Sequence, residues 1–213
     1  MLQRIDLRGA NKPFASLLPR FDVSAGMPTA AVREILSKVR DGGDEAVRSL
    51  TSQFDGVDIA DFRVAPEILS EAWEALDKGL ASALQVAHDR ILEFHQGERA
   101  QSHEVTQDAI TVLSVPQPVE RAGLYIPGGL ASYPSTVLMT ALPARAAGVN
   151  EIVICTPPNP RGETDQAVLA AAYLCGVDEL YKIGGVQAIG AMAYGTESMR
   201  AVDVIAGPGN AWV

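Results

Sequence analysis

The sequence has no long hydrophobic run and very little cysteine. Among its 213 residues, no apolar stretch is long enough to cross a membrane, and no signal-peptide core follows Met1. The two cysteines, Cys155 and Cys175, each sit in an apolar stretch, which favours buried thiols over a disulfide framework. We therefore expect a protein of the reducing cytoplasm that does not associate with membranes.

An excess of positive charge is also absent. Against 26 Asp and Glu residues stand only 17 Lys and Arg residues, which gives a formal net charge of −9. Nucleic acids and anionic membranes attract basic proteins, so this balance argues against both as partners. The 47% of hydrophobic residues is enough for a sizeable core, which excludes a disordered chain.

Common catalytic motifs are missing as well. The sequence contains neither the G-x-G-x-x-G fingerprint for dinucleotides nor the G-x-x-x-x-G-K-[ST] loop for nucleoside triphosphates. It also contains no serine elbow, no reactive-cysteine signature and no cluster of metal-ligating residues. His88 and His95 are seven residues apart, which is not the spacing of a metal pair on a helix, and His103 lies alone in a polar loop. The residues alone therefore predict no complete active site.

What the first half of the chain does contain is helical periodicity. Apolar residues recur at helix spacing from Thr29, and the outward positions are acidic. We expect breaks at Asp41-Gly42-Gly43 and at Asp55-Gly56, where glycines end helices. Further helices are expected over Glu67–Leu76, opened by Pro66, and over Gly79–His95, and a strand over residues 109–115. The rigid Pro116-Gln117-Pro118 break then predicts a boundary between a mostly helical domain, residues 1–118, and a second domain, residues 119–213.

The second half alternates short apolar strands with helices rich in small residues. This alternation predicts an α/β fold, with a parallel, Rossmann-like nucleotide-binding layer that is incomplete within this sequence. The expected strands are Ala122–Ile126, Glu151–Thr156, Glu179–Ile183 and Val202–Ala206. The expected helices between them are Thr136–Ala147, with Ser135 or Thr136 as its cap, Glu163–Cys175 and Val186–Tyr194.

Three of these four strands end in glycine-rich turns. The turns are Pro127-Gly128-Gly129, Gly184-Gly185 and Gly207-Pro208-Gly209. In a parallel sheet they share the carboxyl edge, where bare backbone and helix N-termini can hold an anion or a nucleotide. The polar residues beside them that could contact a ligand are Tyr125, Gln187 and Asn210, together with Ser135 and Thr136. The alternatives are that the glycines only close turns, that Gln187 faces water and that Asn210 caps a helix.

The motifs around these turns closely resemble those of histidinol dehydrogenase. They are G-L-Y-I-P-G-G at 123–129, P-S-T-V-L-M at 134–139, G-G-x-Q-A-I at 184–189, G-T-E-S at 195–198 and G-P-G-N at 207–210. The resemblance covers essentially the whole chain. It implies an NAD-dependent, zinc-containing homodimer with two incomplete nucleotide-binding-like domains per subunit, which oxidises L-histidinol to L-histidine through an aldehyde.

Carried over by motif, the resemblance assigns NAD contacts to Tyr125, Gln187 and Asn210. The family's zinc ligands and its Glu-His acid–base pair lie further along the chain, so neither catalytic nor metal residues map onto this sequence. The sequence also stops just after its last strand, without the helix that should cover it. We therefore expect an amino-terminal portion of a longer protein that is inactive alone.

Two other functions remain open at this stage. One is a related zinc- and NAD-dependent dehydrogenase that acts on another small alcohol, such as a sulfonated polyol. The residues that would distinguish the two substrates lie outside this sequence. The other is a non-catalytic fragment that binds a nucleotide or a partner chain.

Overall fold

A four-stranded parallel sheet lies at the centre of the computed structural model, which describes residues 6–9, 13, 28–128 and 131–209. Its spatial strand order is β5-β4-β3-β6, and all three pairings are parallel. The strands are β3 (Arg121–Tyr125), β4 (Glu151–Cys155), β5 (Glu179–Tyr181) and β6 (Val204–Ala206). They are joined by α4 (Pro134–Ala147), α5 (Gln166–Leu174) and α6 (Gly185–Tyr194). The predicted α/β fold is confirmed.

The strand order contains a reversal at β3. The chain moves outward from β3 through β4 to β5, then crosses back so that β6 pairs with the other side of β3. This is the order of the first four strands of a doubly wound nucleotide-binding fold, in which ligands bind at the carboxyl edge near the reversal. The reversal places the ends of β3 and β6 next to each other.

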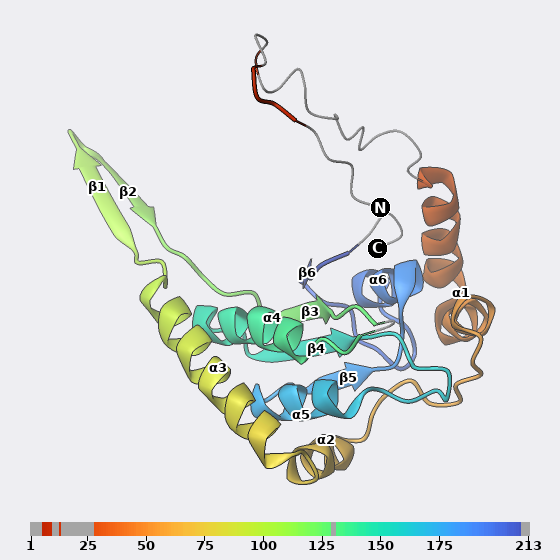
Figure 1. The fold of residues 1–213 in the computed structure, drawn as a ribbon. Helices are drawn as coiled ribbons and strands as arrows, with labels where there is room; N and C mark the ends of the chain where they lie inside the picture. The colour runs from red at the N-terminus through yellow and green to blue at the C-terminus, as the bar shows by residue number, and fades with distance from the viewer. Residues whose placement is uncertain (1–5, 10–12, 14–27, 129–130, 210–213) are drawn as a thin grey trace.

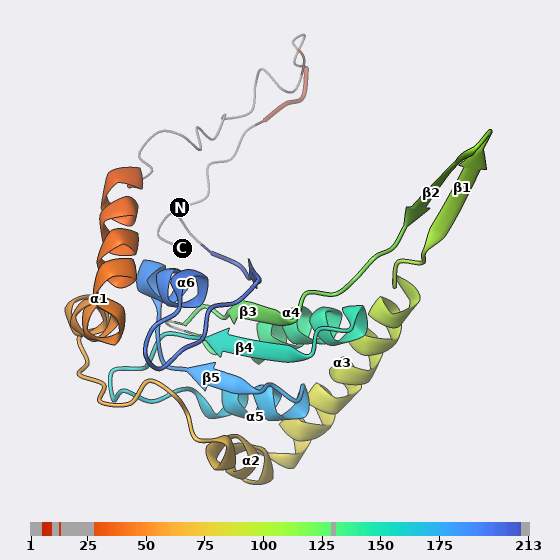
Figure 2. The ribbon, with the colours of Figure 1, turned by 180° about the vertical axis from the view of Figure 1, so that it is seen from behind.

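Helices cover both faces of the sheet (Figure 1, and from behind in Figure 2). On one face α4 packs against α3 (Lys78–Gly97), and α5 packs against α2 (Pro66–Glu74). On the other face α6 packs against α1 (Thr29–Asp55). Because both faces are covered, every residue of β3 is buried, and the one charged residue in it, Arg121, is paired with Glu151 and Glu179. A Cβ at Gly123 would lie 2.7 Å from Met192 Sδ, so glycine there lets α6 approach β3 closely.

The helices before residue 118 share their cores with the sheet that follows. Leu69 and Leu84 belong to one apolar cluster with Leu124 and Ile154 of the sheet. Ile35, Val39 and Val47 of α1 belong to a second cluster with Val153 and Met192. The division of the chain at residue 118 stays a prediction.

Helix α1 bends at the predicted glycine break. Gly43 has φ 51° and ψ −138°, outside helical geometry. Glu197 Oε2 accepts a hydrogen bond from the Asp44 N–H at 2.7 Å, and the Ser198 hydroxyl donates to Asp44 Oδ1 at 2.9 Å. The Gly-Thr-Glu-Ser motif thus fixes the start of the second half of α1, which is a structural role.

The amino edge of the sheet is closed by ion pairs. Arg121, which is buried, donates to Glu151 and to Glu179 at 2.6 Å each, and so joins the first residues of three strands. The Tyr181 hydroxyl donates to Glu179 at 2.9 Å. Carboxylates pair with the two terminal guanidinium nitrogens of Arg121 at this edge, while its buried Nε has no described hydrogen-bond partner, and glycine turns occupy the carboxyl edge.

A two-stranded hairpin projects from the body between α3 and β3 (Figures 1 and 2). It consists of β1 (His103–Gln107) and β2 (Ile110–Ser114), paired antiparallel, and all ten of their residues are exposed. The strand predicted over residues 109–115 is confirmed. The placement of His103 in a loop is wrong, because the polar segment that it opens gains order only by pairing with β2.

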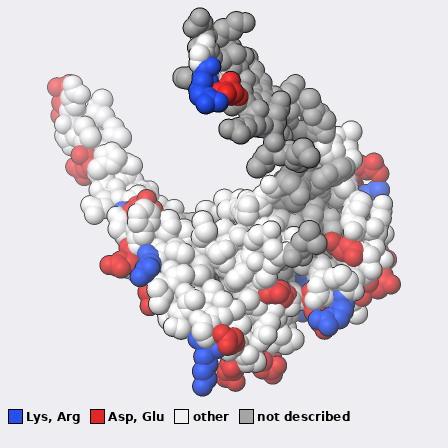
Figure 3. All heavy atoms as spheres, in the orientation of Figure 1, with Lys and Arg blue, Asp and Glu red and all other residues white. Residues whose placement is uncertain are grey.

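Within the described part of the chain, no helix combines the length and the apolar character that crossing a membrane requires. Charged side chains lie mainly at the periphery of the face shown in Figure 3, and the area over α4 is mostly uncharged.

Candidate functional site

The glycine turns after β3, β5 and β6 lie on one edge of the sheet, as predicted. The parallel pairing puts the carboxyl ends of all three strands on the same side. Gly129 and Asn210, which belong to two of these motifs, lie outside the described residues. The site is therefore built from the turns at Pro127-Gly128, Gly184-Gly185 and Gly207-Pro208-Gly209.

Gly207 is required where β6 ends. Its φ is 150°, and a Cβ there would stand 2.3 Å from the Tyr125 carbonyl oxygen. Gly128 and Gly184 have a different role, since a Cβ at either would lie within about 3 Å of Pro157, at 3.1 and 2.8 Å. At these two positions glycine allows the turns to pack closely, which agrees with the alternative that the glycines only close turns.

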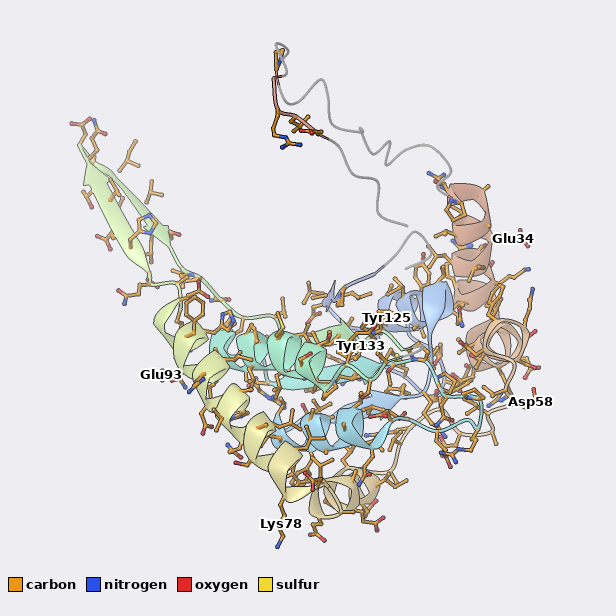
Figure 4. All side chains as sticks on the ribbon, viewed as in Figure 1. Glu34, Asp58, Lys78, Glu93, Tyr125 and Tyr133 are labelled. Carbon is orange, nitrogen blue, oxygen red and sulfur yellow. The ribbon has the colours of Figure 1, made fainter. Side chains whose placement is uncertain are left out.

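Tyr125 connects two of the turns. It is the last residue of β3 (Figure 4), it is buried, and its hydroxyl accepts a hydrogen bond from the Gly185 N–H at 3.0 Å. Burial raises the pKa of the Tyr125 hydroxyl, and the negative charge of Asp55 adds to the rise. The side chain is therefore a neutral phenol that still has its own proton to donate.

Gln187 lies in the first turn of α6 and is only 2% exposed. The alternative interpretation, in which it faces water, is wrong. Its amide nitrogen donates to Asp55 Oδ2 at 3.4 Å, and its amide oxygen lies over Gly185. Gly185 has φ 59°, which favours glycine, and a Cβ there would lie 2.9 Å from Gln187 Oε1.

A cavity of about 270 Å³ opens beside this amide, and we name it cavity A. It is lined by Ile35, Phe54, Asp55, Gly185, Val186 and Gln187. Burial raises the pKa of the Asp55 carboxyl. Asp55 cannot be identified from the sequence, because Asp55-Gly56 indicates only the end of a helix and no local pattern shows that this end faces α6.

A second cavity, of about 490 Å³, lies between the turns after β3 and β4, and we name it cavity B. Gly128, Tyr133, Pro157 and Asp165 are among its lining residues. Asp165 Oδ1 accepts hydrogen bonds from the Ala167 N–H at 2.8 Å and from the Ser132 hydroxyl at 2.6 Å. That oxygen of Asp165 is therefore already used as the cap of α5.

Two helices begin at this edge without a side-chain cap. Helix α4 starts at Pro134 after Tyr133, and α6 starts after Gly184, and neither preceding residue makes a capping hydrogen bond. The cap predicted at Ser135 or Thr136 is wrong, because both residues lie inside the first turn of α4. Uncapped N-termini leave backbone N–H groups and a positive dipole end, which suit a phosphate.

Residues 6–9, 13, 28–128 and 131–209 contain no group of three or more His, Cys, Asp or Glu residues that could hold a metal ion. Cys155 and Cys175 are both buried free thiols, as predicted. Burial raises the pKa of the Cys155 thiol and raises that of Cys175 to about 12. Both cysteines are packing residues.

The sequence and the fold are both similar to those of known proteins. The family model for histidinol dehydrogenase matches residues 20–213. The chain belongs to the histidinol dehydrogenase family. This is a family of oxidoreductases, and it is the family that the glycine-turn motifs indicated.

Individual relatives agree with this assignment. The histidinol dehydrogenase of Methanothermobacter thermautotrophicus is 48% identical over 183 residues, which are 85% of this chain and 43% of the relative. That of Methanococcus maripaludis is 45% identical over 194 residues, or 90% of this chain and 45% of the relative. The crystal structure of histidinol dehydrogenase from Elizabethkingia anophelis has a TM-score of 0.87 and 34% identity, and the match covers 95% of this chain and 48% of that one. The chain thus spans less than half the length of these relatives.

Proposed function

We propose that this chain supplies the NAD-binding part of a histidinol dehydrogenase, which oxidises L-histidinol to L-histidine by way of the aldehyde in histidine biosynthesis. Membership of the histidinol dehydrogenase family is the observation that carries the proposal. The strand order supports it, since in folds with this order dinucleotides bind at the carboxyl edge of the sheet, near the reversal.

The residues at the carboxyl edge fit NAD in chemical type. The uncapped start of α6 suits the pyrophosphate. The Tyr125 hydroxyl and the Gln187 amide supply neutral hydrogen-bonding groups beside it, and Gly207 keeps the backbone bare. Bound NAD would accept the hydride removed from the alcohol carbon, and these residues would hold and orient it. Asn210 completes the proposed contact set.

The described residues do not fit a zinc site, since no suitable group of ligands occurs among them. We derive no catalytic step through zinc. The family resemblance places the zinc ligands and the acid–base pair in later chain, so we propose that the 213-residue chain alone does not turn over histidinol. A homodimeric, cytoplasmic enzyme is the state that the resemblance implies for the whole protein.

Titration of the 213-residue chain with NAD by isothermal calorimetry tests the binding proposal. We expect weak, saturable binding that Gln187→Ala reduces about tenfold, which corresponds to the loss of one or two good hydrogen bonds. Gln85→Ala is the matched control, because Gln85 is an exposed glutamine on α3 far along the chain from the turns. An unchanged NAD affinity in Gln187→Ala would contradict the assignment.

A coupled NADH assay tests the proposal that the 213-residue chain alone does not turn over histidinol. With L-histidinol, NAD and zinc supplied, we expect no turnover by the isolated chain. Turnover would show that the chemistry is complete within these residues. NAD binding without turnover, even after the downstream part of a relative is added, would instead favour a non-catalytic nucleotide-binding role.

A further inference from the structure

Asp55 occupies a position that does not favour a carboxylate. It ends α1, where the backbone carbonyls give the helix its negative pole, and the last turn of α1 contains no basic residue. Its side chain is half-buried, and no described Lys, Arg or His forms an ion pair with it. Asp55 therefore lowers the stability of the fold. A residue that does so is commonly retained because it serves a function.

The surroundings of Asp55 leave its carboxylate available to a ligand in cavity A. Its one described hydrogen bond comes from the Gln187 amide at the long distance of 3.4 Å, so the carboxylate keeps most of its capacity to accept hydrogen bonds. Ile35, Phe54 and Val186 form an apolar wall beside it, and the start of α6 at Gly185 lies on the same cavity. None of the described residues that line cavity A is Lys or Arg.

We propose that Asp55 makes the cofactor site select NAD and reject NADP, by accepting hydrogen bonds from the ribose hydroxyls of the adenosine half. This inference rests on the proposed function and names a specificity residue for it. The uncapped start of α6 would hold the pyrophosphate, Asp55 would hold the adenosine ribose, and Phe54 and Ile35 offer an apolar surface for the base.

The negative charge of Asp55 explains why the site would bind NAD and reject NADP. A carboxylate accepts two hydrogen bonds from a vicinal diol, and acidic residues serve this purpose in other dinucleotide sites. A 2′-phosphate has no proton to offer in that geometry and carries a charge of about −1.5 to −2 at neutral pH. In cavity A it would meet Asp55, and no cation among the described lining residues would balance the repulsion.

Asp165 of cavity B is the competing carboxylate. Its Oδ1 already accepts from Ser132 and from two backbone N–H groups of α5. Among the residues that the structure describes, only Gln187, the predicted cofactor contact, donates to the Asp55 carboxylate. The geometry therefore favours Asp55 as the residue that reads the ribose.

The test measures NAD and NADP affinities of the 213-residue chain and of Asp55→Asn, Asp55→Glu and Asp165→Asn by calorimetry. We expect the unmodified chain to prefer NAD, and Asp55→Asn to shift the NAD-to-NADP affinity ratio toward NADP by at least about tenfold, since it removes the charge. Asp55→Glu keeps the charge and should keep the preference. Asp165→Asn retains a capping side chain and should leave the ratio unchanged.

Each contrary outcome has a separate meaning. An unchanged ratio in Asp55→Asn, with NAD still bound, overturns the role of Asp55 and leaves the proposed function standing. A shift in Asp165→Asn alone would place the ribose in cavity B and also overturn it. Absence of NAD binding by the unmodified chain would remove the proposed function and this inference together. Circular dichroism of each variant verifies that it is folded.

Discussion

The hydroxyl of Tyr125 accepts a hydrogen bond from the backbone N–H of Gly185 at 3.0 Å, across 60 residues of sequence. This contact ties the end of a central strand to the start of the helix that follows an outer strand. Because α6 has no side-chain cap, the phenol replaces one partner that a capping residue would supply.

We predict that Tyr125→Phe lowers the free energy of unfolding by about 0.5–1.5 kcal/mol, because it removes the hydrogen-bond partner of the partly buried Gly185 N–H. Urea denaturation measures this loss. Tyr173→Phe is the control, since Tyr173 is an exposed tyrosine on α5 and should change stability by less than about 0.5 kcal/mol. Equal effects of the two substitutions would contradict the assigned role of the Tyr125 hydroxyl.

Gly207→Ala should be far more damaging than an ordinary glycine substitution. The new methyl group would overlap the Tyr125 carbonyl oxygen, which belongs to the backbone of β3 and cannot move aside freely. We expect a loss of about 2–4 kcal/mol and weaker NAD binding.

Gly97→Ala provides the contrast for Gly207→Ala. Gly97 is the last residue of α3, and nothing lies within 4 Å of a Cβ there. Alanine should be neutral or stabilise the helix by up to about 1 kcal/mol. Thermal denaturation of both variants provides the comparison, and similar melting temperatures would show that β6 can shift away from Tyr125.

Glu197→Ala should loosen the second half of α1. It removes the acceptor of the Asp44 N–H, and we expect a loss of about 1–2 kcal/mol, the usual value of a helix N-terminal cap. Hydrogen exchange should rise selectively at the start of that half-helix. Glu93→Ala, an exposed glutamate on α3, is the control, and increased exchange throughout the protein would argue against a local cap.

Asp55→Asn is predicted to stabilise the fold at neutral pH. Burial raises the pKa of Asp55, so the folded state holds that proton to higher pH than the unfolded chain does. Stability therefore falls as pH rises from the ordinary carboxyl range through the raised pKa, and at neutral pH the charged group lowers it. Removing the charge at a helix C-terminus should return about 0.3–1 kcal/mol.

The pH dependence of stability distinguishes the loss of the Asp55 charge from a change in packing. The advantage of Asp55→Asn over the unmodified chain should shrink as pH falls toward the ordinary carboxyl range, where Asp55 is protonated in both states. Chemical denaturation at neutral and acidic pH measures it. An advantage that stays constant with pH would assign the stabilisation to packing instead.

The order of elements and the parallel sheet could be predicted from sequence, because each depends on local periodicity and on glycine at strand ends. Strand β1 could not, since His103–Gln107 is polar and lies on no core. The start of α4 was misplaced because Tyr133 carries no capping group and Pro134 opens the helix instead.

Only part of the candidate site can be predicted from the sequence. Tyr125 and Gln187 stand beside glycine turns, so their place at the carboxyl edge can be predicted from position along the chain, and their contact with NAD stays a prediction. Asp55 reaches Gln187 across 132 residues, and no local pattern records that meeting. The contact exists only because α1 packs on α6, which is decided by the tertiary fold.

The placement of α1 has a consequence for the order in which the protein can be made. Its inward face, with Val39 and Val47, is translated well before α6, the helix that it covers. The Ser198–Asp44 contact closes over 154 residues, so this part of the core cannot form until residue 198 has left the ribosome. During that interval the apolar face of α1 is without the helix that covers it, and exposed apolar surface of this kind favours aggregation.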